Sequence, residues 1–174
     1  MKITNTPGSS YTPAPEGIHS ALCVDVIDLG LVETAYGEKP KVRLVFELDA
    51  KMEDKRPFIQ TKSFTASLHQ KSTLNGFISK WRGRPITENE TVDLDKLLGA
   101  QATLVISHVQ AQDGSGKVFS SIDAVSKPTK KLTASGEYDP GAARQRIADY
   151  KAKQPGTKPV VKASEEPPLE EPNF

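Results

Sequence analysis

One helical stripe, in a chain otherwise patterned like β-strands, constrains the fold of this sequence most. Apolar side chains recur at the spacing i, i+3, i+4 and i+7 in Leu74, Phe77, Ile78 and Trp81. This spacing is typical of the buried face of an amphipathic helix. Gly83 and Pro85 follow directly and predict that the helix ends there. One helix is therefore expected to pack its apolar face against neighbouring strands.

Five other segments alternate apolar and polar residues with the two-residue period of β-strands. The first begins at Gly17 and is expected to bury Ile18, Leu22, Val24 and Val26. The second, residues 41–49, is expected to bury Val42, Leu44, Phe46 and Leu48. The others span residues 58–65, 102–108 and 118–124, with a turn at 113–116 between the last two. Turn-forming residues between Gly30 and Gly37 predict a loop after the first strand.

Three strands, one helix and two further strands form the element order of the OB-fold. The predicted fold class is therefore mainly β: a five-stranded Greek-key barrel with one helix between strands three and four. SH3-like barrels and small sandwiches share several of these signals and stay open as alternatives.

Composition sets the domain boundaries. Ten of the 13 prolines lie in residues 1–16 and 127–174, and the apolar content of the whole chain is only 36%. We expect a flexible segment over residues 1–16 and a folded domain over 17–127. A basic linker over 128–163, with a short helix at 140–153, and an acidic disordered tail over 164–174 complete the predicted organisation.

The charges are segregated along the chain. Residues 1–140 contain 17 basic and 17 acidic side chains, residues 141–163 contain six basic and one acidic, and residues 164–174 contain four glutamates. A neutral domain is thus followed by a basic arm and an acidic tip.

Catalytic chemistry has little support. The three histidines His19, His69 and His108 are far apart, without the i, i+4 spacing of a metal-binding pair. Cys23, the single cysteine, lies in an apolar strand pattern typical of an inert buried thiol. We therefore expect no catalytic residue, no metal, no cofactor and no enzymatic activity. The alternative is a small hydrolase. It would need an acid–base or metal-binding cluster formed by residues that are distant in sequence and close in the folded structure.

Cations and aromatic rings favour nucleic-acid binding. Single-strand binders combine cations that follow the backbone with rings on which bases stack. Lys41 and Arg43 lie on the non-core face of the second strand. Phe58, Lys62 and Phe64 share one face of the third strand, which is either a binding row or the core face.

Further candidates lie in loops and at the helix end. Tyr36 lies in the first loop, Lys117 and Phe119 share a face of the fifth strand, and Arg82 and Arg84 end the helix. The alternative for these arginines is that they complement the carbonyls at the helix C-terminus. Trp81 is expected in the core.

The acidic tip is a candidate partner-binding element. It contains Glu170, Glu171 and Pro172 and closes on Phe174. A carboxylate beside a terminal aromatic ring suits a pocket with a basic rim. The alternative is an ordinary solubilising tail.

At these residues the sequence resembles phage- and prophage-encoded single-stranded DNA-binding proteins, over about residues 17–127. The resemblance rests on Gly17-Ile18-His19, Asp28-Leu29-Gly30, the 67–84 segment ending Trp-Arg-Gly-Arg, Leu97-Leu98-Gly99 and the 113–116 hairpin. The tail is similar to those of bacterial and T7-like phage single-strand binders, although glutamates replace aspartates and Asn173 precedes Phe174. The resemblance implies an OB-fold that coats single strands and a tail that recruits replication and repair enzymes.

The sequence thus predicts a non-enzymatic protein that binds single-stranded DNA in phage replication, recombination or repair. The expected partners are single-stranded DNA and, through the tail, replication or recombination proteins. The chain has no membrane-length apolar run and no signal-peptide core, so we expect it in the cytoplasm of the host. An OB-like protein-interaction scaffold without nucleic-acid binding is the alternative. The oligomeric state stays open.

Overall fold

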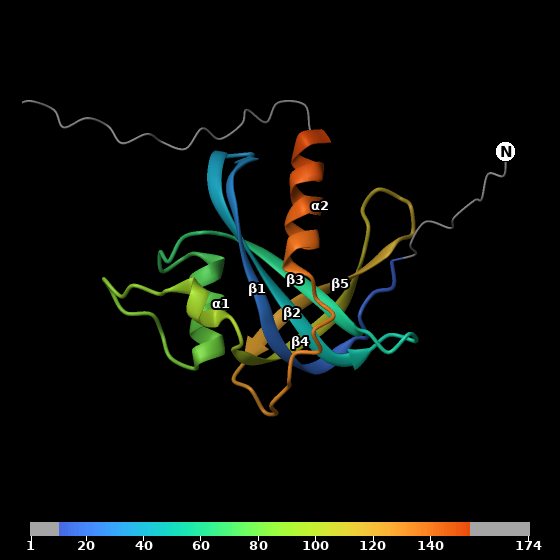
Figure 1. Ribbon diagram of the computed structural model, residues 1–174. Coiled ribbons are helices and arrows are strands. Elements are labelled where there is room, and N and C mark those ends of the chain that lie inside the picture. Colours follow the sequence, from blue (N-terminus) through green and yellow to red (C-terminus); the bar gives the residue numbers. More distant parts are fainter. Residues whose placement is uncertain (1–10, 154–174) are drawn as a thin grey trace, which may run out of the picture. The chain divides into compact units, whose positions relative to one another are not determined.

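The computed structural model describes residues 11–153 (Figure 1). The chain divides into two units, residues 1–140 and 141–174, and each is described by itself. The first unit contains β1 (Gly17–Thr34), β2 (Gly37–Lys51), β3 (Pro57–Thr65), α1 (Thr73–Arg82), the 3₁₀-helix η1 (Leu94–Leu97), β4 (Gln101–Gln110) and β5 (Val118–Ser126). A further helix, α2 (Pro140–Lys153), covers the residues for which a short basic helix is predicted.

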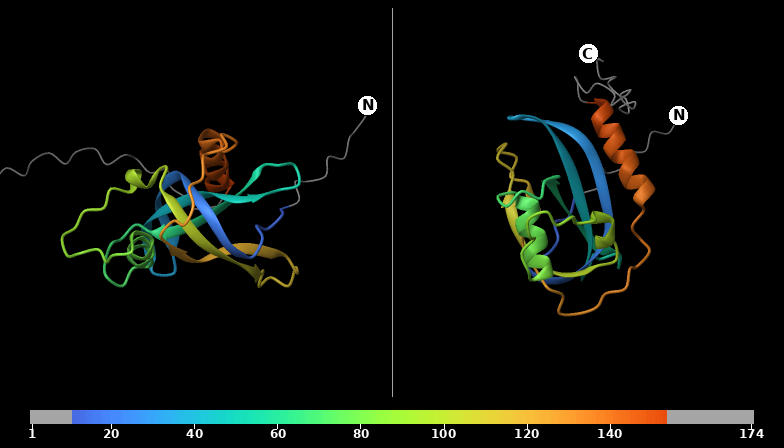
Figure 2. Two further views of the ribbon diagram at one scale, coloured as in Figure 1. Left: turned by 90° about the horizontal axis from the view of Figure 1, so that it is seen from below. Right: turned by 90° about the vertical axis from the view of Figure 1, so that its left-hand side faces the viewer.

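The first unit is a mainly β structure, as the sequence predicts. Its five strands form one antiparallel sheet in the order β3-β2-β1-β4-β5. β1 is the central strand, pairing with β4 through Gly17–Leu22 and with β2 from Ala21 to Thr34. Figure 2 shows that the sheet is strongly curved and that α1 lies at one end of it.

The two edge strands, β3 and β5, are connected by side chains. No backbone ladder joins them in the described residues. The Gln60 Nε2 amide donates to the Ser120 carbonyl oxygen at 3.0 Å, and the Ser120 hydroxyl donates to Gln60 Oε1 at 2.7 Å. Lys62 Nζ donates to the Ile122 carbonyl oxygen at 2.6 Å. The curvature of the sheet therefore brings its first and last strands into contact along a side-chain seam.

The first strand has the predicted inward face only after a register shift, although Leu22 is also buried, at 5% exposed. Ala21 and Cys23 are fully buried in the core, whereas Ile18 is 74% exposed. A register shift between Cys23 and Asp25 changes the phase of the strand, so that Val26 then packs against the core. Strict alternation from Ile18 was wrong because it cannot account for a bulge.

The core lies between the concave side of the sheet and α1. The inward face of β2 is the predicted one, Val42, Leu44, Phe46 and Leu48, and the whole predicted stripe of α1 is buried. Aromatic rings of the sheet meet those of α1 in this core. The centroids of Phe46 in β2 and Trp81 are 5.4 Å apart, and those of Phe64 in β3 and Phe77 are 4.9 Å apart. Trp81 Nε1 donates to the Gln101 carbonyl oxygen at 2.7 Å, which satisfies the indole in the core.

Local signals begin and end α1. The Ser72 hydroxyl accepts from the Asn75 amide at 3.1 Å and serves as the N-cap. Gly83 ends the helix in the left-handed conformation, with φ at 71°. A Cβ at residue 83 would meet only the flexible end of the Lys127 side chain, so the left-handed backbone is what favours glycine here.

Two segments predicted as loop or flexible chain are ordered. β1 and β2 continue past Gly30 into a long hairpin whose turn is only residues 35–36, and Gly30 sits at a bulge with φ at 65°. The described part of the N-terminal segment, residues 11–16, is held against β4 and β5. Ala14 is only 2% exposed, and its carbonyl oxygen lies 2.8 Å from His108 Nε2.

Residues 129–138 run back over the outward side of the sheet. Gln101 exchanges two hydrogen bonds of 2.8 Å with the backbone of Leu132. The Glu47 carboxylate accepts from the Ser135 amide at 2.9 Å and from the Ser135 hydroxyl at 3.0 Å. Glu47 is consequently buried although it belongs to the outward face of β2.

Candidate nucleic-acid interface

Two of the predicted stacking residues belong to the core. Phe58 is 6% exposed and Phe64 is 2% exposed, and both are members of the main apolar cluster. The shared face of β3 is therefore the core face, and the interpretation as a stacking row was wrong for these rings. A base cannot stack on a ring whose faces are covered by Phe77 and its neighbours.

Lys62 lies on the same core face of β3, where a charged side chain is unusual, and its hydrogen-bond partner explains its presence there. Its ammonium group donates to the Ile122 carbonyl oxygen of β5, at the open edge of the core. The long aliphatic stem of a lysine lets its charged end reach a backbone acceptor on the other strand. This lysine therefore joins two strands, and only its remaining donors are available to a ligand.

Lys41 and Arg43 lie on the outward face of β2, as predicted. Arg43 stands opposite Ser63 of β3, and its Nε donates to the Ser63 hydroxyl at 3.0 Å. Lys41 stands opposite Thr65, so the neighbouring positions on β3 are small hydroxyl residues. Cations beside hydroxyls on a sheet surface make a suitable contact for a phosphate backbone.

The two arginines at the end of α1 share a carboxylate. Arg82 Nη1 lies 2.7 Å from Glu90 Oε1, and Arg84 Nη2 lies 3.5 Å from the same oxygen. The Arg82 hydrogen bond, supported by the Thr87 amide, lowers the pKa of Glu90 to about 2. Arg82 is largely covered, with 20% of its side chain exposed, whereas Arg84 is 64% exposed. Arg84 is thus the more accessible of the two for a ligand.

Exposed aromatic rings gather on the two hairpins. Tyr36 is 90% exposed in the β1–β2 turn, which the Thr34 hydroxyl stabilises by donating to the Gly37 carbonyl oxygen. Phe119 is 43% exposed near the start of β5, two residues after the exposed Lys117. Both rings are therefore accessible to a ligand.

Sequence reasoning missed Tyr11. Its ring centroid lies 5.5 Å from that of Phe119, and 58% of the residue is exposed. The local sequence gives no signal for this contact, since Tyr11 lies in a proline-containing segment and its partners are more than 100 residues away. Trp81 was expected in the core and is only 6% exposed.

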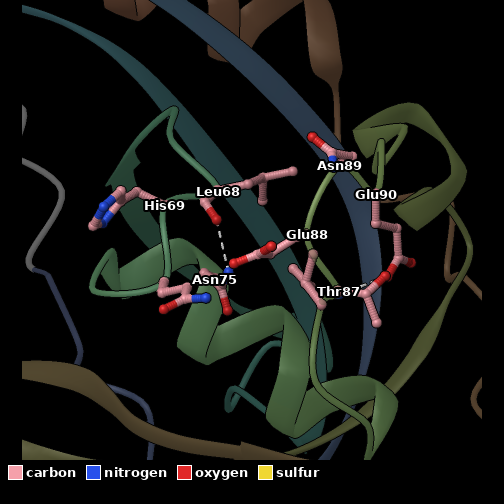
Figure 3. A pocket seen from close by; sticks show the side chains of 9 residues that line it. Leu68, His69, Asn75, Thr87, Glu88, Asn89 and Glu90 are labelled. Atoms are coloured by element: carbon pink, nitrogen blue, oxygen red, sulfur yellow. Dashed lines mark hydrogen bonds between the residues drawn. The ribbon is translucent and has the colours of Figure 1, made fainter.

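A surface hollow of about 490 Å³ lies apart from these rings (Figure 3). Its lining mixes the apolar Leu68 and Ile86 with polar groups: Asn75 donates to the Leu68 carbonyl oxygen at 2.7 Å, and Glu88 and Glu90 lie along the opposite loop. Figure 3 shows His69 on the far side of the hollow from Glu90, so these side chains do not converge. None of the ten residues predicted to bind nucleic acid lines it.

Two of the histidines and the cysteine that were considered for catalysis have structural explanations. His19 Nδ1 lies 3.0 Å from Asp49 Oδ1, and His108 contacts the N-terminal segment. Burial raises the pKa of the Cys23 thiol to about 12, which suppresses the reactive thiolate. Within residues 11–153, no three His, Cys, Asp or Glu side chains gather as metal ligands would.

Comparisons with known proteins give no assignment: no family model matches the sequence, and no curated protein is significantly similar to it. None of the helices in the described part of the chain has the length and apolarity needed to cross a membrane. The predicted partner-binding residues Glu170, Glu171, Pro172 and Phe174 lie outside the described residues.

Proposed function

We propose that this chain is an OB-fold protein that binds single-stranded DNA without strong sequence preference. The strand order supports the fold: closing a β3-β2-β1-β4-β5 sheet joins β3 to β5, and one helix follows β3. In OB-folds the face of strands two and three and the hairpins after strands one and four bind oligonucleotides.

One observation carries the functional proposal. Each of the two hairpins that flank the ligand face of an OB-fold presents an exposed aromatic ring, Tyr36 on one and Phe119 on the other. Lys41 and Arg43 lie on β2, and Lys117 precedes Phe119. Rings for bases and cations for phosphates are the two requirements of a single-strand binder.

The biological setting is proposed from the sequence resemblance. The domain coats single strands during phage replication or recombination in the host cytoplasm. The acidic tail, including Phe174, recruits a replication or recombination protein. No catalytic step is assigned to the chain.

The test is a titration of fluorescein-labelled oligo-dT with the full chain, followed by anisotropy at low and high salt. Trp81 is buried, so its emission is a poor reporter and the label belongs on the DNA. We expect tight binding to the single strand and weak binding to a duplex of equal length. Absence of binding at low salt, with the tail present and removed, would refute the proposal.

Arg43 offers a sharper version of this test. Each phosphate contact contributes about −0.7 to the slope of log K against log salt for a single strand. Arg43→Met should therefore reduce the slope by about 0.7. Lys71→Met, an exposed lysine outside the proposed face, is the matched control and should leave the slope unchanged.

A protein-interaction scaffold is the second candidate. Ile18 is 74% exposed and lies opposite Val105, which is 36% exposed, on the outward face of β1 and β4. Exposed apolar side chains paired on a sheet face are suited to a protein partner. Binding of a partner protein without any affinity for oligo-dT would favour this candidate.

A further inference from the structure

Tyr11 and Phe119 form an exposed aromatic pair from two distant parts of the chain. Their centroids are 5.5 Å apart with the ring planes tilted by 42°. Both residues are more than two-fifths exposed and neither belongs to the main apolar cluster. The pair therefore keeps two large rings accessible at the start of β5.

The hydroxyl end of Tyr11 is fixed by the seam between β3 and β5. The Ser120 hydroxyl uses its single hydrogen to donate to Gln60 Oε1. Ser120 Oγ therefore accepts a hydrogen bond from the Tyr11 hydroxyl, and the two oxygens are 2.9 Å apart. The Tyr11 oxygen in turn accepts from the Ser120 amide at 3.3 Å. This network holds the edge of the ring and leaves ring surface exposed.

The backbone beside Tyr11 is also held. His108 Nε2 lies 2.8 Å from the Ala14 carbonyl oxygen, and the His108 amide donates to Glu16 Oε1 at 2.8 Å. With Ala14 buried, the segment has anchors at residues 11, 14 and 16. A ring held in place loses less conformational entropy when a ligand binds to it.

We propose that Tyr11 and Phe119 together form a base-stacking step for single-stranded nucleic acid, with Lys117 contacting the adjoining phosphate. This inference rests on the proposed function and adds the N-terminal segment to the binding site. An exposed cation two residues from Phe119 favours a nucleotide over an apolar protein face.

The experiment measures affinity for labelled oligo-dT with the full-length variants Tyr11→Ala, Phe119→Ala and Tyr11→Phe. Loss of one stacking ring is expected to weaken binding about 5-fold to 150-fold. Tyr11→Phe keeps the ring and should stay closer to the parent chain. Leu98→Ala removes an exposed apolar side chain without a ring, so affinity should not change.

An abasic strand of the same length separates stacking from charge. The abasic strand carries phosphates without bases. The Tyr11→Ala and Phe119→Ala variants should therefore bind this strand with the same affinity as the parent chain. Equal losses on both strands would overturn the stacking step. Thermal unfolding of each variant checks the fold, and Phe119→Ala tests the step independently should Tyr11→Ala unfold.

The outcomes distinguish the two proposals. No binding of oligo-dT by the parent chain refutes the proposed function itself. Tight binding by the parent chain and by both alanine variants refutes only the stacking step. A change of molar mass in light scattering, with affinity unchanged, would instead assign the rings to a contact between copies and overturn this inference.

Discussion

At the scale of single residues, burial decides what each aromatic ring can do. Phe58 and Phe119 are both the second residue of a β-strand, yet one is 6% and the other 43% exposed. The first contributes to the apolar free energy of folding, and the second leaves a ring face accessible to a ligand. In the described part of the first unit, candidate stacking residues are therefore reduced to the exposed rings Tyr11, Tyr36 and Phe119.

Glu90 allows a prediction about pH. Its pKa is about 2 in the folded protein, because of Arg82, against an ordinary value of 4.5. A carboxyl with a depressed pKa stabilises the fold above its unfolded pKa, and this contribution is lost as the pH falls from about 4.5 to about 2. Glu90→Gln should therefore be less stable than the parent at pH 6 and converge with it near pH 2.

Urea unfolding at several pH values measures this difference. Glu88→Gln in the same loop is the control and should retain the pH dependence of the parent chain. A constant gap between Glu90→Gln and the parent from pH 6 to pH 2 would show that the carboxylate charge is not the cause.

At the scale of secondary-structure elements, the β3–β5 seam distinguishes this sheet from one closed by a ladder. Three side-chain hydrogen bonds, from Gln60, Ser120 and Lys62, join the two strands. Removing one partner of a buried hydrogen bond leaves the other unsatisfied, which costs about 1–3 kcal/mol. The same network also positions Tyr11, so the seam links stability to the proposed site.

Gln60→Leu tests the seam. It keeps a similar side-chain volume but removes both hydrogen bonds to Ser120, so the free energy of unfolding should fall by about 1–3 kcal/mol. Gln110→Leu, at an exposed position of β4, should change it by less than about 0.5 kcal/mol. Equal stability of the Gln60→Leu variant and the parent in urea would show that the seam does not hold the edge strands together.

At the scale of the whole molecule, segregated charge is expected to govern the proposed binding of DNA. The neutral first 140 residues give weak long-range attraction for DNA, the basic arm adds attraction, and four glutamates in residues 164–174 oppose it. These opposing fields are screened by salt over roughly 10 Å at 0.1 M.

Removal of residues 165–174 should strengthen binding of oligo-dT at low salt, because four negative charges that compete with phosphate are lost. The gain should shrink as salt is raised. Anisotropy titrations of the truncated and full chains at two salt concentrations measure it. Unchanged affinity at low salt would reject competition by the tail and leave partner recruitment as its proposed role.

The sequence alone determined the elements that depend on near neighbours. The stripe of α1, its end at Gly83, the inward face of β2 and the turn between β4 and β5 follow from periods and residue types within a few positions. Their physical causes are local: side-chain direction along a helix or strand, and the backbone freedom of glycine.

Only the tertiary structure decided which faces are covered. Before the bulge that follows Cys23, β1 turned the unexpected face inward, the pairing of β3 turned Phe58 and Phe64 inward, and Tyr11 reached Phe119 across the chain. Each result depends on contacts between residues far apart in sequence, where a shift of one position moves a side chain to the opposite face. Periodicity in one strand does not contain that information, and the packing of the neighbouring strands supplies it.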